Sequence, residues 1–551
     1  MTETTGARRI VTRLVAAGAT HLFGYPGESS LPLYQATNKE PGIVHVMARC
    51  ERCAGYMADG YARATNSVGL CDAPGGVGTP WLVPALHESF TSAVPIVALT
   101  TSSPDLGEGR WPTTHCDNAA LFSSVSKAVL PLRVGERIEE IIDRALWLAL
   151  SGRPGPVVID IEPSLLTAEG EPVLGRSAAG TVTLPRERPR PDRAVIAATA
   201  DRVLTAARPL LVLGGGIHTS AAYPQVQAFV DALGIPAATT FNGKGALPED
   251  HPQWAGVIGA KGQPRANHLA ESADLVLWVG SKGGDKSTQY GTLPPRSAHR
   301  VQVDIDPEAL GRTFAVDAAV CSDLGAFLDD LREAVVQRAP AWQAAAWAQH
   351  SDRDVPSDWG GALVLSTVRP AVGHPLRLVA DASKASSWSG AYDRTPGRGR
   401  WVWAPRGSGT LGYALPAAVG AAVAHPDEPV VVVNGDGGFA MSAHEIETAV
   451  AAGARLAVIV LDNSALGLLE DVGRHSLGAD FRLPGRPTAD WALLARAYGA
   501  HAAQVFTEQE LAVELTAWQE RGGVVVLDAV LPGAEISPDL AMFISQGGRS
   551  W

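Results

Sequence analysis

The chain has 551 residues, a formal net charge of −12 at pH 7 and five cysteines. This length predicts roughly two to four domains with large cores, and an acidic balance without a basic block speaks against a nucleic-acid partner or a membrane surface. No apolar run approaches the ~18 residues of a membrane helix, and the start MTETTGARRI lacks the apolar core of a signal peptide, so we expect a cytoplasmic protein. The small, odd number of cysteines argues against a disulfide framework.

The segment ARCERCAGYMADGYAR (48–63) predicts a helix, because apolar side chains from Cys50 to Tyr61 recur on one face. Glu51 falls in the first turn of this largely apolar helix, where burial raises the pKa of a carboxyl group. The alternative role of Glu51 is to complement the helix dipole. Cys50 and Cys53 flank Glu51 as a CxxC pair, but no second Cys or His pair lies nearby in the sequence. We therefore expect neither a metal nor a redox function there.

Between residues 111 and 354, the chain contains one candidate proton donor, one glycine-rich turn and two linkers. The loop WPTTHCD holds His115, whose ordinary pKa suits proton transfer, although a solvent-facing loop histidine is the alternative. The strand and glycines of PLLVLGGG (209–216) could cradle a phosphate. Segments 167–193 and 349–354 are polar and lack a period, as linkers do. They divide the chain into three α/β domains, predicted at residues 1–168, 190–338 and 360–551.

Two motifs lie in the last third of the chain. In GSGTLGYALPAA (407–418), the glycines allow the backbone to approach a ligand closely. In VVVVNGDGG (430–438), a β-branched run typical of a strand covered on both faces enters a Gly-Asp-Gly turn. Residues 439–452 predict the crossover helix that follows, and LAVIVLDN (456–463) predicts the next parallel strand.

The carboxyl ends of neighbouring parallel strands meet at one edge of a sheet, so we expect Asp436 and Asn463 to lie side by side. A carboxylate, an amide oxygen and a loop carbonyl suit Mg²⁺, which completes its octahedron with phosphate oxygens and water. A lone Gly-Asp-Gly is more often a plain tight turn, and this alternative has to be weighed against the other motifs.

The segment 430–463 resembles the thiamine diphosphate signature. In that signature, Gly-Asp-Gly is followed some two dozen residues later by Asn-Asn; here Asp462 replaces the first Asn. The 48–63 helix and the 407–418 loop resemble segments of the acetolactate synthase and pyruvate decarboxylase family. HLFGYPG (21–27) and NGKGALPEDHP (242–252) match the family as well. The resemblance covers essentially the whole chain. It implies three doubly wound parallel-sheet domains: pyrimidine-binding, central and diphosphate-binding.

The resemblance also implies the site. Glu51 would be the activating glutamate, and Mg²⁺ would be held by Asp436, Asn463 and the carbonyl of Ala465. Leu411 would wedge between the two cofactor rings, while the carbonyl of Gly409 and the amide of Leu411 would bond the aminopyrimidine. The other expected thiamine diphosphate contacts are Tyr25, Pro26, Gly27, Ser383, Lys384, Gly435, Gly437, Gly438, Leu466, Gly467 and Leu468. Because the glutamate and the metal motif fall on different domains, a homodimer or homotetramer with its site between subunits is implied.

Several departures from the family bear on the substrate. His115 stands where acetolactate synthases usually carry a Gln-Glu pair, and a histidine in this loop donates protons in pyruvate decarboxylase. Lys384 replaces a neutral residue near the diphosphate; it either supplies a cation there or points to solvent. Trp81, Trp111 and Trp388 are expected as pocket walls. Leu468 and Leu469 occupy the positions where pyruvate decarboxylase has a carboxylate, which disfavours simple aldehyde release.

The sequence therefore favours an enzyme that decarboxylates a 2-oxo acid and ligates the resulting carbanion to a second carbonyl compound. The alternatives are a 2-oxo acid decarboxylase, a 2-hydroxyacyl-CoA lyase and, outside enzymes, an inactive regulatory paralogue. FAD or ADP in the central domain is not favoured, because GGDK (283–286) stands where the flavin-binding segment should have an Asp-Arg pair.

Overall fold

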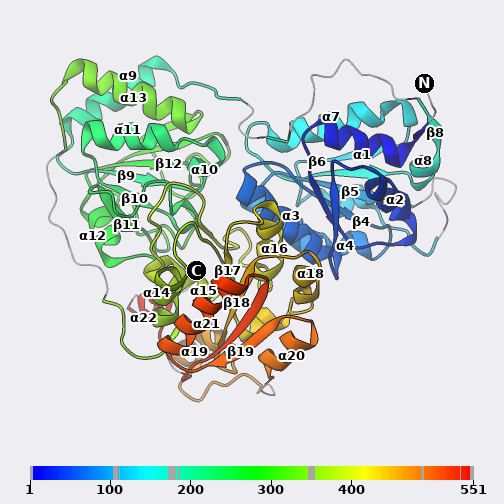
Figure 1. Ribbon diagram of the computed structural model, residues 1–551. Helices are drawn as coiled ribbons and strands as arrows, with labels where there is room; N and C mark the ends of the chain where they lie inside the picture. The colour runs from blue at the N-terminus through cyan, green and yellow to red at the C-terminus, as the bar shows by residue number, and fades with distance from the viewer. Residues whose placement is uncertain are drawn as a thin grey trace.

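The computed structural model describes residues 4–103, 110, 112–171, 182–183, 187–344, 354–484, 489–533 and 535–545. These residues form three six-stranded parallel sheets flanked by helices, one sheet in each lobe of Figure 1. The prediction of three doubly wound parallel-sheet domains is confirmed. Each sheet lies within one predicted domain; the domain boundaries themselves stay predictions, because parts of both predicted linkers fall outside the described residues.

The N-terminal sheet has the strand order β3-β2-β4-β5-β7-β6. Its strands are β2 (His21–Gly24), β3 (Val44–Met47), β4 (Gly69–Ala73), β5 (Ile96–Thr101), β6 (Ala128–Leu132) and β7 (Val157–Ile161). Its helices are α1 (Gly6–Ala16), α2 (Leu31–Lys39), α3 (Glu51–Thr65), α4 (Gly78–Trp81), α5 (Val83–Thr91), α6 (Asn118–Phe122), α7 (Ile138–Leu150) and α8 (Pro163–Thr167). A short antiparallel pair, β1 (Thr4–Thr5) and β8 (Glu169–Gly170), lies apart from this sheet.

The central sheet has the order β11-β10-β9-β12-β13-β14. Its strands are β9 (Pro209–Leu213), β10 (Ala237–Thr239), β11 (Trp254–Val257), β12 (Leu275–Val279), β13 (His299–Asp304) and β14 (Ala318–Cys321). The helices are α9 (Arg193–Thr205), α10 (Gly216–Ser220), α11 (Tyr223–Leu233), α12 (Pro264–Ser272) and α13 (Leu324–Arg338). The predicted strand at 209–213 is confirmed.

The C-terminal sheet has the order β16-β15-β17-β18-β20-β19. Its strands are β15 (Arg377–Ala380), β16 (Val402–Trp403), β17 (Val430–Gly435), β18 (Leu456–Asp462), β19 (His501–Val505) and β20 (Val524–Val530). The helices are α14 (Gly361–Val372), α15 (Lys384–Tyr392), α16 (Ala414–Ala424), α17 (Asp436–Ala440), α18 (Glu445–Ala451), α19 (Gly467–Leu477), α20 (Trp491–Ala497), α21 (Glu508–Arg521) and α22 (Pro538–Ser545). The four valines of β17 are fully buried, as a strand covered on both faces requires.

The predicted single crossover helix at 439–452 is wrong: α17 ends at Ala440 and α18 begins at Glu445. Backbone bonds between them run to the residue three positions earlier, from Met441 to Gly438 and from Glu445 to Ser442. Such tight turns carry the chain past the N-terminus of α3, where the carbonyl of Met441 accepts a hydrogen bond from Arg52. A contact with another domain therefore overrides the local helical pattern.

Helices α3 and α16 cross at close range and join the N-terminal to the C-terminal domain, as Figure 1 shows in blue and yellow. A Cβ on Gly60 would overlap the carbonyl of Ala417, and one on Gly420 would overlap the carbonyl of Met57. The two glycines thus permit a backbone approach that any side chain would prevent.

Among the described helices, none is both long and apolar enough to cross a bilayer.

Candidate active site

Predicted site residues lie at two places, each where a sheet reverses its strand order. The N-terminal sheet reverses between β2 and β4, and the C-terminal sheet reverses between β15 and β17. Ligands of open α/β sheets bind beyond the carboxyl ends of the strands at such points. Tyr25, Pro26 and Gly27 follow β2 directly, and Asp436 follows β17. Topology therefore favours a ligand at both predicted places.

Glu51 is the first residue of α3, and only 7% of it is exposed. A Cβ on Gly78 would lie 2.6 Å from Oε1 of Glu51 and 2.8 Å from Pro74, so the glycine leaves room for the carboxyl group. Burial is the main cause that raises the pKa of Glu51, with further contributions from the charges of Cys50 and Asp72. A carboxyl group with a raised pKa can hold and exchange a proton, which is the property that the predicted role of Glu51 requires.

Asp72 and His45 form a buried pair that the sequence did not reveal. His45 Nε2 lies 2.6 Å from Oδ1 of Asp72, and burial raises the pKa of this aspartate. The two residues lie on β4 and β3, with β2 between them. They meet because Gly24 on β2 has no side chain: a Cβ there would overlap Asp72. The only signal in the sequence was a polar residue in each of two otherwise apolar strands.

His115 lies in an exposed loop, and its Nδ1 is 3.3 Å from the hydroxyl of Ser103. The adjacent Thr114 packs over Gly76, where a Cβ would lie 3.1 Å from the threonine. The loop thus covers the chain that follows β4, close to the segment that contacts Glu51. Both the proton-donor hypothesis and the solvent-facing alternative for His115 stay open. Trp111 of the same loop is outside the described residues.

The two halves of the metal motif leave the C-terminal sheet at one edge, because Gly435 of β17 pairs in register with Leu461 of β18. Asp436 is the first residue of α17 and is 3% exposed. Its Oδ1 accepts a hydrogen bond of 2.7 Å from the backbone N–H of Gly437. The two strands thus end side by side at one edge of the sheet, as the sequence predicted.

Asn463 follows β18 and begins a tight loop. Its Oδ1 accepts a 3.3 Å hydrogen bond from the N–H of Ala465, and the intervening Ser464 has a left-handed φ of 53°. Asp462, which replaces the usual first Asn, accepts a 2.8 Å hydrogen bond from the N–H of Ser464. The side chain of Asp462 therefore stabilises the unusual backbone that carries Asn463 and Ala465. Leu466 precedes α19, and Gly467 and Leu468 begin it.

Asp381 was missed by the sequence reasoning, although it organises both glycine-rich motifs. It follows β15 and accepts hydrogen bonds from the N–H groups of Gly412, Tyr413 and Ala414 at 2.9, 3.1 and 3.3 Å. A Cβ on Gly438 would overlap its carboxylate. Burial raises the pKa of Asp381 to about 6. In the sequence, the only indication of this role was that Asp381 is an acidic residue directly after an apolar strand.

Lys384 is buried and does not point to solvent. Its Nζ lies 2.5 Å from a carboxylate oxygen of Asp471 and donates a 2.9 Å hydrogen bond to the carbonyl of Glu535. The same Nζ would lie 3.5 Å from a Cβ on Gly467, beside the amide of Asn463. Lys384 thus stands at the edge of the metal-motif loop, next to Ser383, which caps α15 with a φ of 75°.

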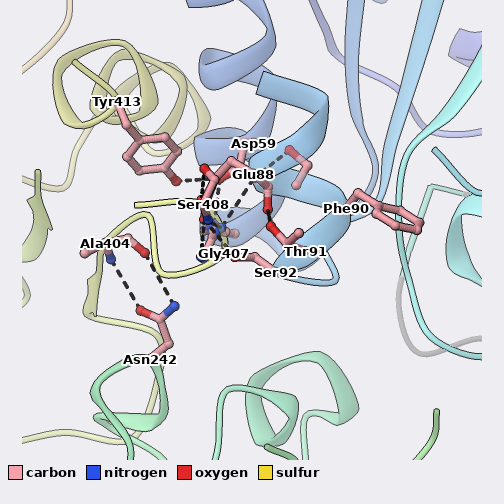
Figure 2. Close-up of polar contacts among 12 residues, drawn as sticks. Asp59, Glu88, Phe90, Thr91, Ser92, Asn242, Ala404, Gly407, Ser408 and Tyr413 are labelled. Atoms are coloured by element: carbon pink, nitrogen blue, oxygen red, sulfur yellow. Dashed lines mark hydrogen bonds and ion pairs between the residues drawn. The ribbon is translucent and has the colours of Figure 1, made fainter. Parts of the chain in front are cut away.

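The loop that carries Gly409 and Leu411 is anchored on the N-terminal domain. Buried Glu88 accepts hydrogen bonds from the N–H groups of Gly407 and Ser408, at 3.0 and 2.6 Å, and from the hydroxyl of Ser92, at 2.7 Å (Figure 2). Two further ties join the domains nearby: Tyr413 donates to Asp59, and Tyr56 and Thr410 pair through their hydroxyls. Within the N-terminal domain, Arg63 reaches Glu88. Gly409 itself has a φ of +69°, which favours glycine.

The C-terminal donor set fits a magnesium diphosphate. The Asp436 carboxylate, the Asn463 amide and the Ala465 carbonyl are hard oxygen donors with too little charge for a closed cage, which leaves positions for phosphate oxygens and water. At Gly435, nothing lies within 4 Å of the place a Cβ would take. The buried side-chain amide of Asn434 has no hydrogen-bond partner among the described residues; an unpaired buried amide marks a place where a bound group or water belongs.

The expectation for the CxxC pair considered only ligands nearby in the sequence, whereas the fold brings further possible ligands from a distant segment. His444 and Glu445 come from the C-terminal domain to Cys50 and Cys53, and the four possible ligand atoms all lie within 4.8 Å of one another. Hydrogen bonding to Cys53 lowers the pKa of Cys50 to about 4, and hydrogen bonding to Cys50 raises the pKa of His444. Residues nearly 400 positions apart meet here, which the local sequence could not reveal.

The two remaining tryptophans predicted as pocket walls differ in exposure. Trp81 is 53% exposed and lines a cavity of about 650 Å³. Trp388 is buried in the core against Gly361, and Nζ of Lys384 lies 6.0 Å from the centre of its ring, so its role as a pocket wall stays a prediction. A second cavity of about 730 Å³ lies mainly in the central domain, lined by residues that include Gly215, Gly216 and Lys286. The absence of a nucleotide from the central domain stays a prediction.

Three models of thiamine pyrophosphate enzymes match the chain. The N-terminal thiamine pyrophosphate-binding domain matches residues 4–121, the central domain matches 196–331, and the C-terminal thiamine pyrophosphate-binding domain matches 381–529. Together they account for most of the chain in the order in which the three sheets occur. The chain belongs to the thiamine pyrophosphate enzyme family, and its resident cofactor is thiamine diphosphate.

Acetolactate synthases are similar along nearly the whole chain. The isozyme 2 large subunit of Escherichia coli (strain K12) is 30% identical over 95% of this chain and 94% of that protein. The isozyme 3 large subunit is 29% identical over 96% and 95% of the two chains. The large subunit of Parasynechococcus marenigrum is 31% identical over 92% and 84%. These matches support a thiamine diphosphate-dependent carboligase over the decarboxylase, lyase and non-enzyme alternatives.

Proposed function

We propose that this protein is an acetolactate synthase-like carboligase, which decarboxylates a 2-oxo acid and joins the remaining fragment to a second carbonyl compound. One observation carries the proposal: the chain holds both a buried carboxyl group, Glu51, in its N-terminal domain and the oxygen donors Asp436 and Asn463 at one edge of its C-terminal sheet. Thiamine diphosphate supplies the electron sink that accepts the bonding pair when carbon dioxide leaves.

The residues of this chain have separate tasks in the proposal. Asp436, Asn463 and the carbonyl of Ala465 hold Mg²⁺, which fixes the diphosphate. Glu51 holds a proton on its carboxyl group and exchanges it with a ring nitrogen of the aminopyrimidine. Leu411 sets the angle between the cofactor rings, and Asp381 fixes the loop that carries it through three backbone hydrogen bonds. His115 is the proton donor at the substrate.

The absence of a carboxylate at Leu468 and Leu469 favours ligation over aldehyde release. In α19, Leu469 is 55% exposed, and the nearest acid, Glu470, is engaged by Arg474 at 2.6 Å. The carboxylate of Glu470 is thus oriented toward Arg474. The fragment is then left for a carbonyl acceptor.

We also propose that the active site is completed by a second copy of the chain, in a homodimer or homotetramer. Large apolar side chains are exposed on the N-terminal domain: Val44, Met47, Val77 and Trp81 are each between 47% and 72% exposed. Val77 precedes Gly78, whose Cβ position lies 2.6 Å from Oε1 of Glu51. Exposed large apolar groups are typical of interaction surfaces. They supply the surface through which the Glu51 half of one copy would meet the metal half of another.

The test measures carbon dioxide release from a panel of 2-oxo acids, with thiamine diphosphate and Mg²⁺ present or omitted, while mass spectrometry identifies the products. Cofactor-dependent release with a hydroxyketone product that contains both substrates supports the carboligase. Free aldehyde as the product shows a decarboxylase instead. Cleavage of a 2-hydroxyacyl-CoA, without carbon dioxide release from any 2-oxo acid, shows the lyase.

Two variants connect the activity to the site. Glu51→Gln should lose turnover while still binding Mg²⁺ and thiamine diphosphate, whereas Asp436→Asn should lose the binding itself. Glu136→Gln is the control, because Glu136 is exposed and far along the chain from both motifs. A Glu51→Gln protein with full turnover would overturn the proposed role of this carboxyl group.

A further inference from the structure

Four side chains that can bind a metal ion meet between the N-terminal and C-terminal domains. Cys50 and Cys53 lie at the start of α3, and His444 and Glu445 lie at the start of α18. His444 Nε2 is 3.8 Å from each sulfur atom, and 3.5 Å from Oε1 of Glu445. All four ligand atoms lie within 4.8 Å of one another. None of them belongs to the proposed thiamine diphosphate site.

These separations are close to those of a tetrahedral zinc site. Zinc binds sulfur at ~2.3 Å and nitrogen at ~2.1 Å, which places a sulfur and a nitrogen ligand roughly 3.6 Å apart in a tetrahedron. The observed sulfur–nitrogen distances of 3.8 Å exceed this by little, so side-chain movements of a few tenths of an ångström would close the site around an ion. Two thiolates, an imidazole and a carboxylate form a ligand set that selects zinc over magnesium or calcium.

The surroundings are those of a closed metal site rather than a chance contact. Cys53 and Glu445 are fully buried, Cys50 is 6% exposed, and the His444 side chain is 35% exposed. Glu445 is oriented from outside the cluster: its Oε1 accepts the backbone N–H of Arg49 at 2.9 Å, and its Oε2 accepts the hydroxyl of Thr448 at 2.6 Å. Outer hydrogen bonds of this kind fix the ligands of metal sites.

Charge and access also suit a cation. Two thiolates and a carboxylate would bring three negative charges together, which a divalent ion offsets in large part. Arg52, which donates a 2.5 Å hydrogen bond to the carbonyl of Met441, adds one positive charge beside them, so a net negative charge still remains for the ion. Cys50 and His444 line the cavity of about 650 Å³ next to Trp81, which gives an ion a path to the ligands.

We propose that Cys50, Cys53, His444 and Glu445 bind one zinc ion that ties the N-terminus of α3 to α18. Glu51 lies between the two cysteines in the sequence, so the ion would hold the backbone on both sides of this carboxyl group. Zinc is a positioning element in this proposal and takes no part in the reaction. Its influence on turnover rests on the proposed function, whereas zinc binding itself does not.

The test uses the full-length protein without a histidine tag, purified anaerobically under reducing conditions. Elemental analysis should find one zinc per chain after dialysis against metal-free buffer. Replacement by Co²⁺ should give a thiolate-to-cobalt charge-transfer band together with the strong visible bands of tetrahedral cobalt. Cys50→Ser, Cys53→Ser and His444→Gln should each weaken zinc binding by at least ~100-fold.

The controls separate this site from other thiols and from folding. Cys321→Ser removes an exposed thiol on β14 and should leave zinc content and cobalt spectra unchanged. His444→Gln changes a partly exposed side chain, so the variant should fold even where the cysteine variants fail. A protein without zinc that also gives no tetrahedral cobalt spectrum overturns the proposal, as does a Cys50–Cys53 disulfide in the anaerobic protein. Such results leave the carboligase proposal intact, because Glu51→Gln and product analysis test it independently.

Discussion

Glu88 on α5 accepts hydrogen bonds from both the backbone N–H and the hydroxyl of Ser408, at 2.6 and 2.8 Å, across the boundary between the N-terminal and C-terminal domains. Ser408 begins the loop that carries Gly409 and Leu411, so the conformation of the predicted cofactor loop depends on a carboxylate more than 300 positions earlier. Arg63 lies 3.4 Å from the same carboxylate and offsets its charge.

We expect Glu88→Gln to lower the free energy of unfolding by about 3 kcal/mol, because it leaves the buried loop N–H groups without their charged acceptor and leaves Arg63 with Asp59 as its ion-pair partner. The affinity for thiamine diphosphate should fall with it, since the loop loses its anchor. Urea unfolding and a cofactor titration followed by tryptophan fluorescence measure both effects. Glu136→Gln, which replaces an exposed carboxylate, should change neither quantity.

The crossing of α3 and α16 gives a second prediction. Gly420→Ala should destabilise the protein by about 2 kcal/mol or more, because the new methyl group would overlap the carbonyl of Met57 and force the helices apart. Gly533→Ala is the matched control, since nothing lies within 4 Å of the position of its Cβ. Equal melting temperatures for the two variants would show that the helices can separate without cost.

Local patterns were sufficient to predict the parts of the site that lie on one segment of chain. The burial of Glu51 follows from the apolar period of α3, and the shared edge of Asp436 and Asn463 follows from two β-branched strands. Two buried strands joined by a crossover connection pair in parallel, and the carboxyl ends of neighbouring parallel strands lie at one edge of the sheet. These features need no knowledge of other domains.

The features that the sequence did not reveal are contacts between distant segments. Glu88 and Ser408 share no pattern, and the break between α17 and α18 depends on Arg52 of another domain. His444 reads as an ordinary helix-flanking residue until the fold brings it to Cys50 and Cys53. Pairings of this kind are set by how domains pack, and no local period encodes them.

Asp381 gives a prediction about pH. Burial raises its pKa from 3.8 to about 6 in the folded protein. The folded state therefore holds this proton more tightly than the unfolded state, so the contribution of Asp381 to stability is fully present below about pH 4 and is lost as the pH rises through 6. A shift of this size corresponds to roughly 3 kcal/mol.

The measurement compares the wild type with Asp381→Asn by urea unfolding between pH 4 and pH 7. The asparagine does not titrate, so between pH 4 and pH 7 the unfolding free energy of the wild type should fall relative to that of Asp381→Asn by roughly 2 kcal/mol. Asp480→Asn, at an exposed position, should follow the wild type at every pH. A constant difference between wild type and Asp381→Asn would contradict a raised pKa.

Lys384 and Asp471 give the last prediction. The Lys384 ammonium lies between Asp471 and the loop of Asn463 and Gly467, so a diphosphate in that loop would compete with Asp471 for the cation. Lys384→Met should weaken binding of magnesium thiamine diphosphate by ~10-fold or more, and Asp471→Asn should strengthen it a few-fold. Stability should change little in Lys384→Met, because Arg474 still pairs with Asp471 at 3.0 Å.

Isothermal titration at fixed ionic strength measures the affinities, with Lys39→Met as the surface control. Unchanged affinity in Lys384→Met would show that the lysine only holds α15 and α19 together, and that the diphosphate is neutralised by the metal and backbone alone.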